Sequence, residues 1–266
     1  MAERPAVVTL LTDFGSADAY VGIMKGVALG VRRDLTLVDL THDIPPQAVA
    51  VGALLLRSAV PFFPAGTVHC AVVDPGVGSA RAGVAVVTDA AVLIGPDNGL
   101  LAPAAAALGG ARAIVELQHT ALFRHPVSAT FHGRDVFAPV AAHVAGGLDP
   151  LTLGPHRDGL VPLDLPAPRL AADAVQGEVI HVDRFGNLLT NIDAAALAAF
   201  RDHRLSVTVG AMSPVAGLVA TYADAAPGGL CALLSSWGTL EIARRDGSAA
   251  AALGAGRGAA VTVRRE

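Results

Sequence analysis

The sequence predicts an α/β protein with two domains. The first is a mostly parallel sheet flanked by helices at residues 1–168, and the second is a smaller antiparallel β barrel or sandwich at residues 169–266. Three observations predict this fold. Apolar runs alternate with helical segments in the first half of the chain. Residues 154–170, rich in proline and glycine, interrupt that pattern. Beyond them, short β-like runs follow one another between turn residues.

The first half reads as strands that alternate with helices. Apolar runs that end in polar or turn residues predict buried strands at residues 6–12, 35–40, 67–73, 83–87 and 91–95. Helices are expected at residues 19–31, 48–59 and 137–145, and Ser16 or Asp18 is expected to cap the first of them. This alternation favours a largely parallel sheet that is covered on both faces.

The second half changes character after a linker. β-like runs lie at residues 174–182, 205–209, 217–220, 231–235, 239–243 and 259–263. One short helix is expected at residues 194–200. Because turn residues separate most of these runs, the pattern predicts a small antiparallel domain.

Composition excludes several classes of protein. The 266 residues are 53% hydrophobic and only 16% charged, with a net charge of −4 and no block of like charge, which argues against a nucleic-acid binder. Cys70 and Cys231 lie in apolar runs far apart, and this favours buried thiols over a disulfide framework. The sequence has no apolar stretch of about 18 residues and no signal-peptide pattern. We therefore expect a cytoplasmic protein without a membrane segment.

The segment VVDPGVGSAR, residues 72–81, is the most informative stretch. Asp74 follows a predicted buried strand, and Pro75, Gly76 and Gly78 then predict a tight turn. Arg81 stands where the next apolar run begins. A carboxylate and a guanidinium at the two ends of one loop form either a reaction centre or an ion pair that only holds the loop.

Other polar residues at turns also have two interpretations. Among common signatures, GxGxxG, the phosphate loop, HExxH and GxSxG are all missing, and the nine histidines lack metal-ligand spacing, so we expect neither a metal nor a cofactor. Simple structural roles exist for each remaining candidate: a helix cap, a core histidine, an Asx turn, core aromatic residues or a hairpin. These candidates are Asp13, His132, Arg134, Asp183, Phe185, Asn187, Tyr222, Ser236 and Trp237.

Eight segments together resemble the S-adenosyl-L-methionine hydroxide adenosyltransferase family, once a domain family of unknown function and related to the fluorinase and chlorinase enzymes. They span nearly the whole chain in the family's order. The segments are TDFGSADAYVGIMKGV (12–27), THDIPPQ (41–47), FFPAGTVH (62–69), VVDPGVGSAR (72–81), GPDNGLL (95–101), TFHGRDVFAP (130–139), VDRFGNLLTNI (182–192) and SSWGTLEIA (235–243).

The resemblance implies a catalytic triad of Asp74, Arg81 and His132, and a ribose-binding carboxylate at Asp13. It implies a homotrimer whose ligand sites lie between the N-terminal domain of one subunit and the C-terminal domain of the next. The C-terminal residues that it implies are Phe185 and Asn187 beside adenine, Tyr222 stacked on the base, and Asp183 and Ser236 at the methionine ammonium. Trp237 stands where the halogenases carry an arginine, which leaves the methionine carboxylate contact open.

The activity implied is hydrolysis of S-adenosyl-L-methionine to adenosine and L-methionine. Water attacks ribose C5′, Arg81 stabilises its developing hydroxide character, and Asp74 or His132 accepts the proton. A halogenase that makes 5′-halo-5′-deoxyadenosine is the first alternative, but a carboxylate at position 74 repels an incoming anion. A non-catalytic module that binds adenosine or S-adenosylmethionine is the second.

Overall fold

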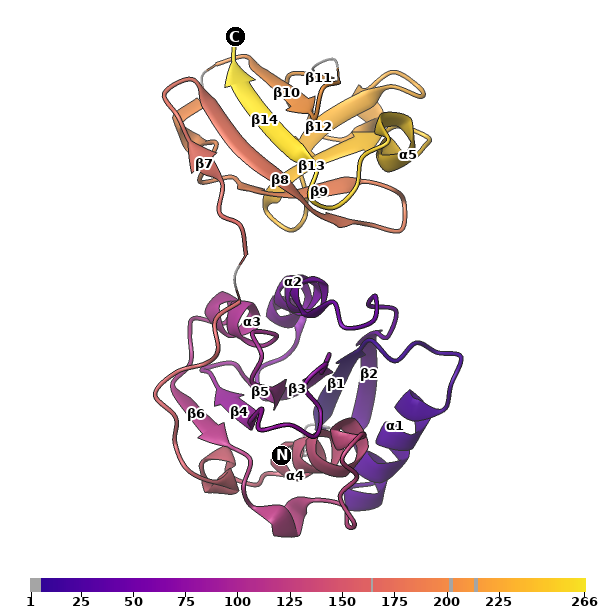
Figure 1. The fold of residues 1–266 in the computed structure, drawn as a ribbon, viewed down its shortest axis with the longest axis vertical. Helices are drawn as coiled ribbons and strands as arrows, with labels where there is room; N and C mark the ends of the chain where they lie inside the picture. Colours follow the sequence, from indigo (N-terminus) through magenta and orange to yellow (C-terminus); the bar gives the residue numbers. More distant parts are fainter. Residues whose placement is uncertain (1–5, 164, 201–202, 213–214) are drawn as a thin grey trace. The chain divides into compact units, whose positions relative to one another are not determined.

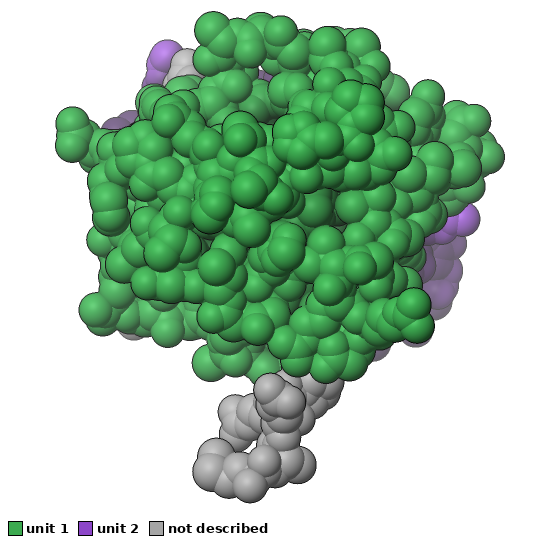
Figure 2. Space-filling model, turned by 90° about the horizontal axis from the view of Figure 1, so that it is seen from below, with its two compact units in different colours: residues 1–164 green, residues 165–266 purple. Residues whose placement is uncertain are grey.

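The structure is a computed structural model that describes residues 6–163, 165–200, 203–212 and 215–266. The chain divides into two compact units, residues 1–164 and 165–266 (Figure 1). Figure 2 colours these two units separately. Each unit has a hydrophobic core of its own, so each is described by itself.

The first unit contains a six-stranded mixed sheet with the order β2-β1-β3-β5-β4-β6. Its strands are β1 Val7–Thr12, β2 Thr36–Thr41, β3 Thr67–Val72, β4 Gly83–Val87, β5 Ala91–Pro96 and β6 Ala113–Glu116. β2, β1, β3 and β5 run parallel, whereas β4 runs antiparallel to both β5 and β6. Only residues 88–90 join β4 to β5, and a parallel pair needs a crossover of about a dozen residues. The mostly parallel sheet is confirmed, with an antiparallel edge.

Helices cover both faces of this sheet (Figure 1). α1 Tyr20–Val31 and α4 Ala138–Ala145 pack on one face, and α2 Val49–Ala59 and α3 Ala102–Ala107 pack on the other. Successive residues of a strand point to opposite faces of the sheet, so they pack into two different hydrophobic clusters. The prediction of a cap for α1 is wrong: Ala19 occupies that position without a side-chain hydrogen bond. Ser16 and Asp18 lie ahead of it in the loop.

The second unit is an eight-stranded antiparallel sheet with the order β11-β10-β14-β8-β9-β13-β12, and β7 pairs with β8. Its strands are β7 Arg169–Leu170, β8 Ala174–Val182, β9 Leu188–Asp193, β10 Leu205–Val209, β11 Val215–Ala216, β12 Leu230–Leu234, β13 Thr239–Arg244 and β14 Ala260–Arg265. Val219 N–H donates to Ala232 O at 2.9 Å, so the chain beyond β11 reaches β12. The sheet is therefore a nearly closed barrel, as predicted.

Two expectations for this unit are wrong in detail. Residues 194–200 form turns and one 3₁₀ turn, Ala198–Phe200, because the Asp193 carboxylate accepts from Ala196 N–H and ends the regular structure. The strand expected at residues 217–220 ends earlier, at Ala216. Gly217 follows with φ +73°, a left-handed conformation that ends a strand.

His69 on β3 is expected to make the stability of the first unit sensitive to acid. Its side chain is fully buried, Nδ1 lies 2.8 Å from Thr9 Oγ1, and burial lowers its pKa from 6.5 to about 4. Between pH 6.5 and 4 the unfolded chain takes up a proton that the folded chain does not bind. The free energy of unfolding therefore falls by about 3 kcal/mol as the pH drops through this window, and then levels off.

Denaturant titrations at pH 7, 5 and 4 measure this loss. His69→Asn keeps a polar partner for Thr9 but removes the titration, so we expect a flatter pH profile. The matched control is His203→Asn at an exposed position. An identical acid slope in wild type and His69→Asn would contradict the assignment.

Candidate active site

The loop after β3 brings Arg81 back to Asp74. Hydrogen bonds within the loop make the turn: Val77 N–H donates to Asp74 O, and Ser79 Oγ donates to Gly76 O. Gly78 has φ +77°, and a Cβ there would overlap the Ala129 carbonyl. Glycine is therefore required both by the conformation and by the close approach of residue 129.

Asp74, Arg81 and His132 form one hydrogen-bonded cluster. Arg81 Nε donates to Asp74 Oδ1 at 3.1 Å, Arg81 Nη2 donates to Asp74 Oδ2 at 2.5 Å, and the same nitrogen lies 3.2 Å from His132 Nδ1. The two charged side chains are only 10% and 4% exposed, and Arg81 lies 5.4 Å from the ring centre of Phe137. Hydrogen bonds to ionised partners in such a dry setting are strong and fixed in direction.

The cluster defines the tautomer of His132. A guanidinium only donates hydrogen bonds, so Nδ1 accepts from Arg81 and the ring proton lies on Nε2. Burial and the charge of Arg81 lower the pKa of His132, against the carboxylates of Asp74 and Asp135. His132 is thus a neutral donor through Nε2–H. Asp74 keeps lone pairs beyond those that Arg81 uses, so its carboxylate can accept a further hydrogen bond.

A π-helical turn, Gly133–Phe137, holds His132 at its start. Single π-helical turns are frequent at functional sites. Asp135 within it is fully buried and accepts from Arg134, from Arg124 and from Ser128 N–H. Arg134, a candidate from the sequence, therefore pairs with Asp135 rather than with Asp74.

Asp13 follows β1, directly beside β3 in the sheet. The carboxyl ends of such neighbouring parallel strands are where open α/β sheets bind ligands. Asp13 Oδ2 accepts from Gln47 N–H at 2.7 Å. Gln47 has φ +65°, a conformation that non-glycine residues seldom adopt and that tends to persist at functional sites. The backbone of residue 47 thus fixes a carboxylate suited to hydroxyl groups.

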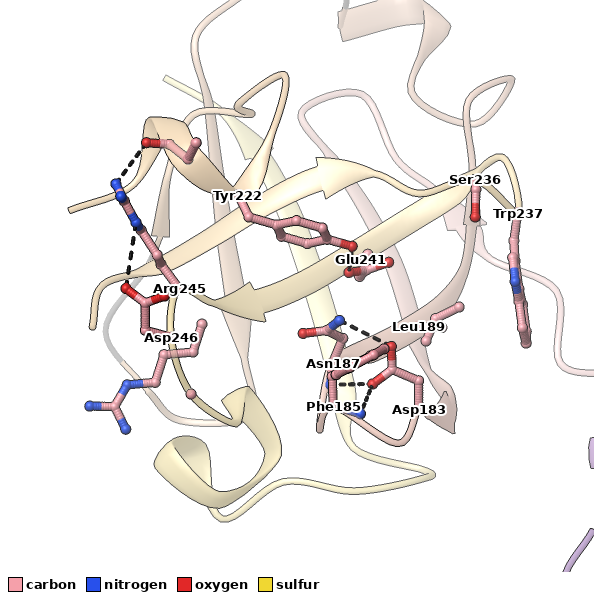
Figure 3. Close-up of a pocket in the computed structure, with 13 residues that line it drawn as sticks. Asp183, Phe185, Asn187, Leu189, Tyr222, Ser236, Trp237, Glu241, Arg245 and Asp246 are labelled. Carbon is pink, nitrogen blue, oxygen red and sulfur yellow. Dashed lines mark hydrogen bonds and ion pairs between the residues drawn. The ribbon is translucent and has the colours of Figure 1, made fainter. Parts of the chain in front are cut away.

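The second unit contains a cavity of about 850 Å³ (Figure 3). Phe185 and Tyr222 are 77% and 43% exposed, so their aromatic rings are accessible to a flat apolar ligand. All six candidates from this half of the sequence line the cavity: Asp183, Phe185, Asn187, Tyr222, Ser236 and Trp237.

Two of the structural roles considered for these residues are present as well. Asp183 accepts from Phe185 N–H, Asn187 N–H and Asn187 Nδ2, which builds the turn between β8 and β9. Trp237 lies in the hairpin turn between β12 and β13, where its backbone N–H donates to Ser235 Oγ, and its ring also stacks on His181 with ring centres 5.6 Å apart. These contacts fix the positions of Asp183, Asn187 and Trp237 along the cavity wall.

Glu241 in this cavity was not found from the sequence. Tyr222 Oη donates to Glu241 Oε1 at 2.7 Å, and Glu241 is only 4% exposed (Figure 3). The one sequence signal is a lone acidic residue within the apolar run LEIA.

No helix among the described residues is long and apolar enough to span a membrane.

The fold and these groups define the class: a two-domain α/β protein with a buried Asp–Arg–His cluster in one domain and an aromatic-lined cavity in the other. Family models of the SAM hydroxide adenosyltransferase N-terminal and C-terminal domains match residues 8–154 and 177–262. The chain belongs to the SAM hydroxide adenosyltransferase family.

Individual relatives agree with this membership. A Salinispora tropica protein named (R)-S-adenosyl-L-methionine hydrolase is 43% identical over 96% of this chain and 95% of its own length. A fluorinase of Nocardia brasiliensis is more distant, at 29% identity over 93% of each chain. The crystal structure of an uncharacterized conserved protein from Thermotoga maritima superposes with a TM-score of 0.91 at 33% identity, over 97% of this chain and all of the other.

Proposed function

We propose that this protein is an S-adenosyl-L-methionine hydrolase, which forms adenosine and L-methionine. The observation that carries the proposal is the buried Asp74–Arg81–His132 cluster, with a carboxylate where an incoming anion would need a donor. The hydrolase name of a relative at 43% identity supports it.

In the proposed reaction, the oxygen of a water molecule attacks ribose C5′ while the C5′–sulfur bond breaks. The bonding electron pair leaves with sulfur, which turns the sulfonium into the neutral thioether of methionine. Asp74 accepts the water proton and later returns it to solvent. Arg81 and the Nε2–H of His132 stabilise the developing hydroxide by donating to it.

The remaining residues bind the substrate. Asp13 accepts from the ribose hydroxyls, and Phe185, Asn187 and Tyr222 bind adenine. Asp183 and Ser236 hold the methionine ammonium, and Trp237 covers that end. The triad belongs to one unit and the cavity to the other. As the family resemblance implies, the complete site forms between subunits of a homotrimer. A cytoplasmic location is also proposed, and the free, buried Cys70 and Cys231 support it.

Product analysis tests this function. S-adenosylmethionine is incubated with the protein, with and without fluoride or chloride, and nucleoside products are separated by chromatography. We expect adenosine and methionine in equal amounts, unchanged by halide. A 5′-halo-5′-deoxyadenosine would establish the halogenase alternative. Bound adenosine without any methionine release would establish the binding module.

A further inference from the structure

Glu241 occupies a place in the barrel where a carboxyl group is unfavourable. On its two neighbouring strands the residues directly opposite are Leu189 and Leu233, which share its face of the sheet. Cys231 and Ala243, two residues away along β12 and β13, are also buried. A carboxyl group surrounded in this way loses hydration, and burial accordingly raises the pKa of Glu241. An aliphatic side chain would suit this position better for folding alone.

Tyr222 is the group that Glu241 binds, and among the described residues Glu241 is the hydrogen-bond partner of the Tyr222 hydroxyl. It lies on a one-turn 3₁₀ segment, Tyr222–Asp224, in an exposed loop. The hydroxyl donates to Glu241 at 2.7 Å, and burial raises the pKa of Tyr222 to about 12, so the hydroxyl remains a donor at any physiological pH. Glu241 itself lies on β13, which is paired on both sides. The hydrogen bond therefore joins an exposed ring outside the sheet to a strand that is paired on both sides.

We infer that Glu241 is a positioning residue for nucleoside binding, which fixes the Tyr222 ring over the cavity by accepting its hydroxyl hydrogen bond. This inference rests on the proposed function, since it takes Tyr222 as the surface on which adenine stacks. A ring fixed before the ligand arrives spends less conformational entropy on binding than a freely rotating one. Because the stack is the same in substrate and transition state, its loss raises KM and leaves kcat unchanged.

Four variants test the inference by steady-state kinetics on S-adenosylmethionine and by calorimetry with adenosine. Glu241→Ala and Tyr222→Phe are each expected to raise KM and the adenosine Kd about tenfold, the effect of losing one hydrogen bond, with kcat unchanged. The double variant is expected to match either single variant. Glu241→Gln keeps an acceptor oxygen and is expected to stay within about twofold of wild type.

Glu241→Leu, the fifth variant, separates positioning from folding. Its thermal midpoint is expected to equal or exceed that of wild type, because leucine matches Leu189 and Leu233 and removes a buried carboxyl, while KM still rises. The inference would be overturned if Glu241→Gln raised KM as much as Glu241→Ala does. It would also be overturned if the losses of the two single variants added in the double variant, or if KM were unchanged in Tyr222→Phe. A wild-type protein that neither releases methionine nor binds adenosine would instead overturn the proposed function.

Discussion

Replacing Arg81 with lysine is expected to lower kcat for S-adenosylmethionine hydrolysis about a thousandfold, the order of effect seen when one donor to a developing oxyanion is lost. Arg81 donates to both oxygens of Asp74 and reaches His132 Nδ1 with one planar group. Lysine keeps the charge but is a point donor on a flexible stem, so it cannot hold three partners in one plane. Its retained charge also avoids leaving the buried Asp74 carboxylate without a cation.

The measurement separates chemistry from binding. Single-turnover rates report the chemical step, and calorimetry reports the adenosine Kd, which we expect to change by less than about twofold because Arg81 acts on the water. The matched control is Arg112→Lys, where the arginine pairs with Asp89 but is 68% exposed. A wild-type kcat in the Arg81→Lys variant would show that Arg81 has no role in the chemical step.

A substitution at Asp74 tests which group accepts the proton of the attacking water. In Asp74→Asn the side chain has the same shape but cannot accept a proton, and we expect a loss of kcat as large as in Arg81→Lys. Near-normal activity in Asp74→Asn would mean that another group accepts the proton, despite the bond of His132 Nδ1 to Arg81.

The fold was predictable wherever hydrophobic period and turn chemistry agree. β3 is a fully buried run that ends before Asp74 and Pro75, and both signals point the same way. β9 Leu188–Asp193 was missed because its polar Thr190 and Asn191 interrupt the apolar pattern, although Thr190 is buried and donates to Leu240 O. α3 and α5 Ala249–Leu253 consist mainly of alanine, which fits any face and leaves no period to read.

Some residues of the candidate site could be predicted from the sequence, and others could not. Asp13 and Asp74 were visible because they follow strands, where a polar side chain has a known direction. Glu241 was not, because a glutamate in a strand normally faces solvent, and only its neighbours Leu189 and Leu233 reveal the buried face. Gln47 donates to Asp13 through its backbone N–H, which every residue except proline has, so this contact could not be predicted from the residue type.

Replacing Asp135 with asparagine is expected to lower the free energy of unfolding by about 2 kcal/mol, the order of effect of losing hydrogen bonds to a buried charged group. Asparagine has nearly the same shape, but it leaves Arg124 and Arg134 without a negative charge and turns an amide N–H toward them. Denaturant titration at pH 7 measures the loss. The matched control is Asp34→Asn, where Asp34 also accepts two hydrogen bonds from a nearby arginine but is 65% exposed, and no clear change is expected.

The same substitution is expected to reduce kcat, because Asp135 connects two parts of the triad. It anchors the segment before His132 through Ser128 N–H and Arg124, and the Ala129 carbonyl of that segment lies against Gly78 in the loop between Asp74 and Arg81. Loosening this segment frees both His132 and the loop, so kcat falls. The adenosine Kd, which depends on Asp13 and on the cavity of the second unit, is expected to stay unchanged. Asp135→Asn with full kcat at a temperature where it is folded would show that the two sides of the triad are held independently.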